Sequence, residues 1–282
     1  MIAITGATGQ LGRLVIAALL EHGTPKEKVI ALARHPQHAG DLGVDVRDFN
    51  YTQPETMVIS LQGVDTLLLI SSNELGQRAT QHQAVIDAAK EAGVKLLAYT
   101  SVLHATDSAL GLAGEHRQTE QYLAASGLPF VLLRNGWYHE NYTAGVPAAV
   151  EHGALLGSAG EGRIASATRA DYAQAAAVVL SGEGHAGKTY ELAGDTSYTL
   201  SELASEVSRQ ADKPVSYHNM PQADYQAALI KVGLPEAVAE LLADSDAAAA
   251  KGALFDDSNT LSTLIGRPTT PVADAVAAAL RR

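Results

Sequence analysis

The chain has 282 residues and no cysteine. Disulfide scaffolds, thiolate zinc sites and cysteine nucleophiles are therefore excluded. It also lacks a run of roughly 20 apolar residues, the length that a membrane-spanning helix needs. The opening segment "MIAITG" enters a strand-like pattern at once, without the basic stretch and cleavage site of a secretory signal. We therefore expect a cytoplasmic protein with no membrane partner.

Positive charge is scarce, because 20 basic residues stand against 31 acidic ones and give a net charge of −11. This balance argues against a broad electrostatic attraction to nucleic acid, but it is compatible with a local basic site for one phosphate. Hydrophobic residues make up 46% of the chain, which is enough for a sizeable core. We expect an ordinary globular protein that does not bind nucleic acid.

Two catalytic patterns are missing as well. The serines at positions 71, 72 and 101 do not stand in a G-x-S-x-G elbow, which argues against an α/β-hydrolase. No His-Glu-x-x-His helix is present, and His35 and His38 belong to a loop beside the glycine-rich region. We therefore expect no metal site.

Short apolar runs alternate with longer amphipathic ones over the first two-thirds of the chain. Apolar or β-branched runs predict strands at 1–5, 28–33, 65–71, 95–101 and 129–135. Apolar residues spaced by three and four predict helices at 10–23, 77–93 and 114–127. This alternation predicts a Rossmann-type α/β fold, a doubly wound parallel sheet that binds its ligand beyond the carboxyl ends of the strands.

The pattern changes after residue 136. Residues 136–166 are loop-rich, 168–182 and 188–194 predict one more helix and one more strand, and the remainder is mostly helical with a capping box at Thr199 and Glu202. We therefore expect a smaller, mostly helical substrate-side domain. The predicted boundaries are 1–135 plus about 165–193 for the Rossmann domain, and 136–164 plus 194–282 for the substrate-side domain.

The segment "MIAITGATGQLGRLVIAALL" carries the strongest functional signal. Gly6, Gly9 and Gly12 follow a strand and open a helix, where they permit a tight turn, close approach to a pyrophosphate and close packing of helix on strand. The helix N-terminus directs free N–H groups toward the phosphates. The predicted phosphate-binding set is Gly6, Ala7, Thr8, Gly9, Gln10, Leu11 and Gly12.

The end of the second predicted strand indicates which dinucleotide binds. A site selective for NAD would place a carboxylate there to bind the ribose 2′-hydroxyl, but "IALARHP" places Arg34 there. A guanidinium suits a 2′-phosphate by charge and by its two-pronged geometry. A solvated loop arginine is the alternative, and we favour NADP(H) as the cofactor.

These motifs resemble the NmrA-like group of atypical short-chain dehydrogenases, through "TGATGQLG", "ARHP", "LLLISS", "AYTS" and "LLRNGWYHENY". The segments "LRNGWYHENY", "IASATRADYA" and "GALFDDSN" are most similar to bacterial quinone-reducing members of that family. The resemblance covers essentially the whole chain and implies a Rossmann domain with a small C-terminal domain. It also implies cofactor contacts at Asn50, Ile70, Ser71, Ser72, Thr100, Ser101, Asn135, Gly136, Trp137, Tyr138, His139 and Glu140.

The acid pair of catalytic short-chain dehydrogenases is absent, because none of the ten tyrosines is followed four positions later by a lysine. His116 and Glu120 occupy the corresponding helix and share one face of it. One interpretation makes His116 a proton donor or substrate contact that Glu120 holds. The other makes the two residues an ordinary surface pair. The sequence leaves both open.

The missing acid restricts the substrate. Reduction of a ketone leaves an alkoxide whose conjugate acid is about as weak as water, with a pKa near 15.7, so a positioned acid is needed. Reduction of a quinone leaves an anion whose conjugate acid resembles tyrosine, at about 10, and such a product can take its proton from water. The sequence therefore disfavours a carbonyl reductase and permits a quinone reductase.

We predict an NADPH-dependent quinone reductase with a small quinone as substrate. Asn135, Trp137, Tyr138 and His116 are its candidate catalytic or substrate-contacting residues, with the aromatic rings supplying flat surfaces for a quinone. The alternative is a regulator that binds NADP(H) and signals redox state to a protein partner. A homodimer is compatible with either interpretation.

Overall fold

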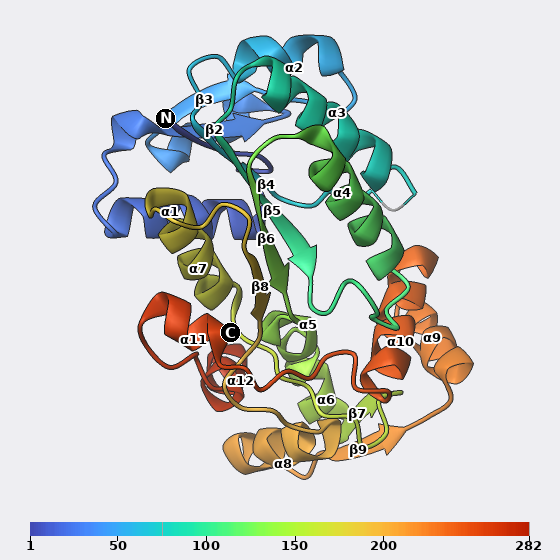
Figure 1. Ribbon diagram of the computed structural model, residues 1–282. Helices are drawn as coiled ribbons and strands as arrows, with labels where there is room; N and C mark the ends of the chain where they lie inside the picture. The colour runs from blue at the N-terminus through green and yellow to red at the C-terminus, as the bar shows by residue number, and fades with distance from the viewer. Residues whose placement is uncertain (75, 282) are drawn as a thin grey trace. The chain divides into compact units, whose positions relative to one another are not determined.

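The computed structural model describes residues 1–74 and 76–281. The first part of the chain contains a seven-stranded sheet with the strand order β3-β2-β1-β4-β5-β6-β8 (Figure 1). The five pairings that connect β3 through β6 are all parallel. The strands are β1 (Ile2–Ile4), β2 (Val29–Ala33), β3 (Asp45–Asp48), β4 (Thr66–Leu69), β5 (Leu96–Val102), β6 (Phe130–Asn135) and β8 (Thr189–Leu192).

The strand order confirms the predicted Rossmann-type fold. β1 lies between β2 and β4, and the chain runs outward from it in opposite directions on its two sides. Such a reversal opens a crevice at the carboxyl ends of the strands, where doubly wound proteins bind their ligands. The strand predicted at 188–194 is β8, at the edge of this sheet.

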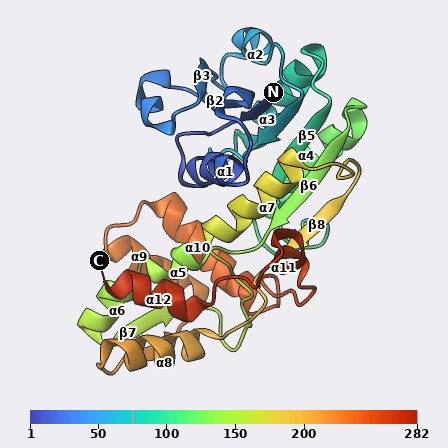
Figure 2. The same ribbon diagram turned by 90° about the vertical axis from the view of Figure 1, so that its left-hand side faces the viewer.

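Helices cover both faces of the sheet. α1 (Gln10–Glu21) packs beside α7 (Arg169–Ser181) on one face, and α2 (Pro54–Ser60), α3 (Arg78–Glu91) and α4 (Ala113–Ser126) cover the other (Figures 1 and 2). Leu67, Leu69, Leu97 and Tyr99 are fully buried in the core beneath α3 and α4. Three short 3-10 helices complete this part of the chain, η1 (Lys26–Lys28), η2 (Pro36–His38) and η3 (Gly40–Leu42).

The second part of the chain is mostly helical, with one small parallel sheet of two strands. Its elements are α5 (His139–Thr143), α6 (Val146–His152), β7 (Ala154–Gly157), α8 (Leu200–Ala211), β9 (Ser216–Asn219), α9 (Gln222–Lys231), α10 (Glu236–Ala249), α11 (Thr260–Ile265) and α12 (Val272–Leu280). The capping box is confirmed, because Thr199 Oγ1 accepts from Glu202 N–H and Glu202 Oε2 accepts from Thr199 N–H, at 3.1 and 2.8 Å.

The loop-rich interpretation of 136–166 is partly wrong. α5, α6 and β7 lie in this range, and β7 pairs with β9, about 60 residues further along. A pairing of two four-residue strands across that separation leaves no periodic signal in the sequence. The local signal for α6 was present, since Pro147 stands in its first turn and Gly153 ends it with a left-handed φ of 68°.

Contacts divide the chain into two compact units. The first unit comprises 1–105, 114–135 and 169–191, and the second comprises 106–113, 136–168 and 192–282. The predicted boundaries fall close to these, but residues 106–113 belong to the second unit, where Gly111 N–H donates to Asp244 Oδ2 at 2.8 Å. Arg282, the end of the predicted substrate-side domain, lies outside the described residues. That the second unit receives the substrate remains a prediction.

No helix in the described part of the chain is both long and apolar enough to cross a membrane.

Candidate functional site

A cavity of about 500 Å³ opens at the carboxyl ends of β1, β2 and β4, inside the first unit. This is the crevice at which the strand order reverses. The walls of the cavity include the glycine-rich turn, the segment after β2 and the segment after β4. Predicted cofactor residues that line it are Gly6, Thr8, Gly9, Arg34, Asn50, Ile70, Ser71 and Ser72.

The glycine-rich turn has the geometry of a phosphate cradle. Gly6 adopts a left-handed φ of 58°, and a Cβ on Gly12 would lie 2.4 Å from the Gly6 carbonyl oxygen. Gly9 caps α1 without a side-chain hydrogen bond, and the first turn of α1 holds no acidic residue. The leading N–H groups of this 12-residue helix therefore have no capping side chain, as the predicted phosphate site requires.

The remaining residues of the predicted phosphate-binding set support this turn. Ala7, Leu11 and Gly12 are buried beneath it, and Gln10 is exposed at the start of α1. They do not line the cavity. Their contribution is to hold helix and strand close together, which fixes the directions of the N–H groups.

Two arginines line the cavity, but their guanidinium groups differ in what they can still bind. Arg13 is engaged at all three nitrogens, by Thr8 O, Asp41 Oδ2 and His38 O, at 2.6 to 3.2 Å. Among the described residues, Arg34 makes one hydrogen bond, from Nη1 to Glu74 Oε1 at 3.1 Å, and its side chain is 57% exposed. Arg34 therefore has N–H donors left over, and its predicted contact with a 2′-phosphate stays a prediction.

Substitution Arg34→Glu tests this assignment. A carboxylate there would repel a 2′-phosphate and could accept from a ribose 2′-hydroxyl, so we expect NADPH affinity to fall by a factor of about 10 or more and NADH affinity to change little. Fluorescence titration with each cofactor measures both constants. An equal loss of affinity for NADPH and for NADH would show that Arg34 does not bind the 2′-phosphate.

A buried polar network holds the segment after β4 against the cavity. Ile70 N–H donates to Thr5 Oγ1 and Ser71 N–H donates to Thr100 Oγ1, both at 2.9 Å. Ser72 N–H donates to His82 Nε2 at 2.9 Å, and the Ser72 carbonyl oxygen accepts from Arg78 Nε at 2.6 Å. The backbone that is expected to pass the ribose and nicotinamide is thus fixed before any ligand binds. Thr100 holds this backbone in place by accepting the hydrogen bond from Ser71 N–H.

His116 is buried inside this network, which contradicts the predicted pairing with Glu120. Its Nδ1 lies 2.7 Å from the Tyr99 hydroxyl, and its Nε2 lies 3.3 Å from Arg78 Nη1. Because an arginine can only donate, Nε2 is the acceptor and the ring proton is on Nδ1. Burial, with Arg78 and His82 as smaller contributions, holds the pKa of His116 well below its usual value. His116 is therefore neutral at physiological pH and is neither an acid nor a surface residue.

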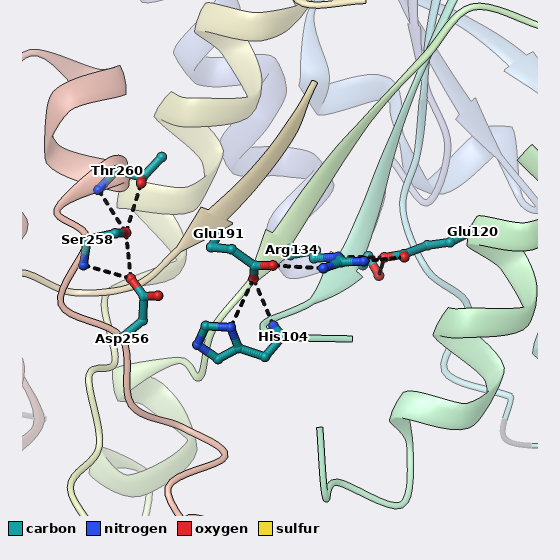
Figure 3. A network of polar contacts seen from close by, with 8 residues as sticks. His104, Glu120, Arg134, Glu191, Asp256, Ser258 and Thr260 are labelled. Carbon is teal, nitrogen blue, oxygen red and sulfur yellow. Dashed lines mark hydrogen bonds and ion pairs between the residues drawn. The ribbon is translucent and has the colours of Figure 1, made fainter. Parts of the chain in front are cut away.

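Glu120 belongs to a different network. It accepts the Ser101 hydroxyl on Oε1 at 2.6 Å and binds Arg134 through both oxygens, at 2.9 and 2.6 Å. Arg134 also donates to Glu191 Oε1 at 2.8 Å, and Glu191 Oε2 accepts the N–H of His104, a residue with a left-handed φ of 53° (Figure 3). The Ser101 hydroxyl therefore donates its hydrogen bond to a carboxylate of a partly buried ion-pair network.

Asn135 ends β6 and is 6% exposed. Its Oδ1 atom is buried and has no hydrogen-bond partner among the described residues. A buried acceptor without a partner is costly in a folded protein, unless a ligand or water satisfies it. This atom is the feature of Asn135 that fits the predicted role in ligand binding.

Residues 136–140 belong to the second unit, and their side chains take part in its packing. Trp137 is buried, and both nitrogens of the His139 ring are in hydrogen-bond range, of Ser166 Oγ at 2.8 Å and the Thr270 carbonyl at 2.9 Å. Tyr138 forms a backbone bridge with Ala167. Gly136 donates its N–H to Leu192, and Glu140 lies in the first turn of α5. Their predicted contacts with cofactor and substrate remain predictions.

A buried carboxyl group in the second unit escaped the sequence analysis. Asp246 is 3% exposed and accepts from Tyr142 OH at 3.0 Å and from Ser158 N–H at 2.9 Å. Burial raises its pKa to about 6, against these two hydrogen bonds, which lower it. The only sequence signal was an acidic residue in the predominantly apolar stretch "ADSDAAAA".

Asp246 should make stability depend on pH. The unfolded chain releases this proton near pH 3.8 and the folded chain near 6, so the folded state binds more protons between these values and loses stability as pH rises through them. We expect Asp246→Asn to stabilise the fold above pH 6, by up to about 3 kcal/mol, with the gain fading toward pH 4. Urea unfolding at several pH values measures this, and a pH-independent difference would contradict it.

The described residues contain no cluster of three or more potential metal ligands.

Comparisons with known proteins agree with this geometry. The profile of a family described as NAD(P)H-binding matches residues 6–183. Quinone oxidoreductase 2 of Escherichia coli is 58% identical over 279 residues, which cover 98% of this chain and 97% of that protein. The crystal structure of an NADPH-dependent quinone oxidoreductase of Escherichia coli, complexed with NADPH, matches with a TM-score of 0.97 and 57% identity, covering 99% of this chain and all of that one.

Triphenylmethane reductase of Citrobacter sp., complexed with NADP(H), matches with a TM-score of 0.95 and 38% identity, covering 99% of this chain and 100% of that one. Both the family profile and these relatives extend over the cavity and the segments that line it. The resemblance noted from the sequence motifs is thereby confirmed. The chain belongs to the NAD(P)H-binding family, of NmrA-like type.

Proposed function

We propose that this protein is an NADPH-dependent quinone oxidoreductase that acts on a small quinone. The proposal rests on the two residues that stand where catalytic short-chain dehydrogenases have their tyrosine and lysine, His116 and Glu120. His116 is buried and neutral, and Glu120 is ion-paired, so neither residue delivers a proton to a substrate. A product anion that takes its proton from water tolerates this, whereas an alkoxide does not.

The comparisons support the same function. The chain is 58% identical to a protein named quinone oxidoreductase over nearly its whole length, and its fold matches a structure of such an enzyme with NADPH. NADP(H) is therefore the cofactor. Gly6 to Gly12 and the α1 N-terminus would hold its pyrophosphate, and Arg34 would hold the 2′-phosphate.

When bound, NADPH supplies the hydride. The protein positions the cofactor and the quinone relative to each other, and such alignment of reacting atoms can account for much of an enzyme's rate. The segment 70–72 is held rigidly by Thr5, Thr100, His82 and Arg78. In this proposal, Asn135 Oδ1 accepts a hydrogen bond from an N–H or O–H group of the cofactor, and Trp137 and Tyr138 offer aromatic surface to the quinone ring.

The test is turnover. We expect the purified protein to oxidise NADPH in the presence of 1,4-benzoquinone faster than the uncatalysed reaction, followed as loss of nicotinamide absorbance. If NADPH protects the protein against heat but no turnover exceeds the background, the chain is the NADP(H)-binding regulator instead. The proposal includes a cytoplasmic location, and cell fractionation tests it. The homodimer that the sequence permits is tested by a mass measurement in solution.

A further inference from the structure

A carboxylate stands beside the predicted 2′-phosphate site, and sequence reasoning did not find it. Glu74 follows β4 and lines the same cavity as Arg34, which follows β2. Glu74 Oε1 lies 3.1 Å from Arg34 Nη1, and this ion pair is half-exposed, with side chains 40% and 57% accessible. The end of β2 carries no carboxylate, but Glu74, which follows β4, brings one next to Arg34.

Glu74 is the anchored partner of this pair. Its Oε2 accepts from Gln81 Nε2 at 2.7 Å, and Gln81 is 6% exposed on α3. Its backbone N–H donates to Ser72 Oγ at 3.2 Å, and Ser72 is itself tied to Arg78 and His82. Arg34 has no other hydrogen bond among the described residues. The carboxylate is therefore fixed in place, while the guanidinium can reorient toward a ligand.

We propose that Glu74 is a specificity-determining residue that opposes binding of the 2′-phosphate and so narrows the preference for NADPH over NADH. A 2′-phosphate and Glu74 compete for the same guanidinium. When both lie against it, two negative charges stand within a few ångströms of each other and repel. A ribose with a free 2′-hydroxyl adds no charge and leaves the Arg34–Glu74 pair intact, so Glu74 does not oppose NADH.

This inference rests on the proposed function only in requiring NADPH to bind the cavity. Its test uses two probes that differ by the 2′-phosphate alone, adenosine 2′,5′-bisphosphate and 5′-AMP, with affinities measured by calorimetry. We expect Glu74→Gln to tighten binding of the bisphosphate by about threefold to tenfold and to change 5′-AMP by less than about twofold. The gain should shrink at high salt, because the pair is half-exposed.

Glu91→Gln is the matched control. It removes one negative charge at the exposed end of α3, ten residues from Gln81, which is about 15 Å along the helix and beyond the screening length at physiological salt. We expect it to leave both affinities unchanged.

Two outcomes would overturn the inference. If Glu74→Gln weakens binding of the bisphosphate, Glu74 pre-orients Arg34 instead of competing for it. If the variant binds both probes as the wild type does, or if both affinities change by the same factor, Glu74 does not discriminate between ligands with and without the 2′-phosphate. Failure of the proposed function looks different, because the wild type would then bind NADPH and the bisphosphate normally without quinone turnover.

Discussion

Gly12→Ala is expected to weaken NADPH binding by a factor of about 100 or more. The added Cβ would lie 2.4 Å from the Gly6 carbonyl oxygen and 2.8 Å from Ala7 Cα. These are backbone atoms of the turn, so α1 must move away from β1 and carry its N–H groups out of position. The cost of overpacking a tight site is typically about 1 to 3 kcal/mol, so the fold should survive with reduced stability. Titration with NADPH and thermal unfolding measure the two effects.

Gly114→Ala is the matched control, because Gly114 also stands in the first turn of a helix, α4. The closest atom to its added Cβ would be the tip of the Arg117 side chain, at 4.0 Å. Alanine is the better helix former by roughly 0.5 to 1 kcal/mol, so we expect this variant to bind NADPH normally and to gain slightly in stability. If Gly12→Ala binds NADPH as well as Gly114→Ala does, close packing of α1 on the turn is not required for binding.

Arg134→Leu is expected to destabilise the protein by about 3 to 5 kcal/mol, because it leaves two partly buried carboxylates without their cation. Arg134 binds Glu120 through two hydrogen bonds and Glu191 through one, and its side chain is 13% exposed. These partners hold the pKa of Arg134 above its usual value, so its charge is never lost at physiological pH. Urea unfolding at neutral pH gives the free energy directly.

The expected loss of stability in Arg134→Leu should come from the burial of Arg134 and its partners, because an exposed ion pair of the same length contributes little. Arg209 pairs with Glu206 at 2.6 Å, as close as Arg134 to Glu120, but Arg209 is 69% exposed. Such surface pairs contribute about 0 to 1 kcal/mol, and we expect Arg209→Leu to stay within that range. Equal losses for the two variants would mean that the Arg134 network is as weak as a surface pair.

The same network explains how this chain differs from a carbonyl reductase. Ser101 lies near the carboxyl end of β5, and its hydroxyl donates a hydrogen bond to Glu120. Glu120 is in turn neutralised by Arg134. Ser101 and Glu120 are thus parts of a hydrogen-bonded ion-pair network that connects β5, α4, β6 and β8, and they do not form a proton-delivering group.

The predicted cofactor residues that line the cavity have local signals in the sequence. Gly6, Gly9 and Gly12 are needed at fixed spacing because a tight turn and a close helix leave no room for a side chain. Arg34 follows directly from its place at the end of a strand. Glu74 could not be found in this way, because it reaches Arg34 from another strand end, 40 residues further along.

The fold class, the glycine-rich turn, the cofactor and the absence of a Tyr-x-x-x-Lys pair could be inferred from the sequence, because each depends on residues close together in the chain. The partners of the buried polar residues became known only from the packing of strands and helices. His116 and Glu120 share a helix face, but side chains four residues apart differ in direction by about 40° and in height by about 6 Å. That offset sends His116 to Tyr99 and Arg78, and Glu120 to Ser101 and Arg134. Helical spacing fixes which residues are neighbours, but the surrounding strands fix what each of them binds.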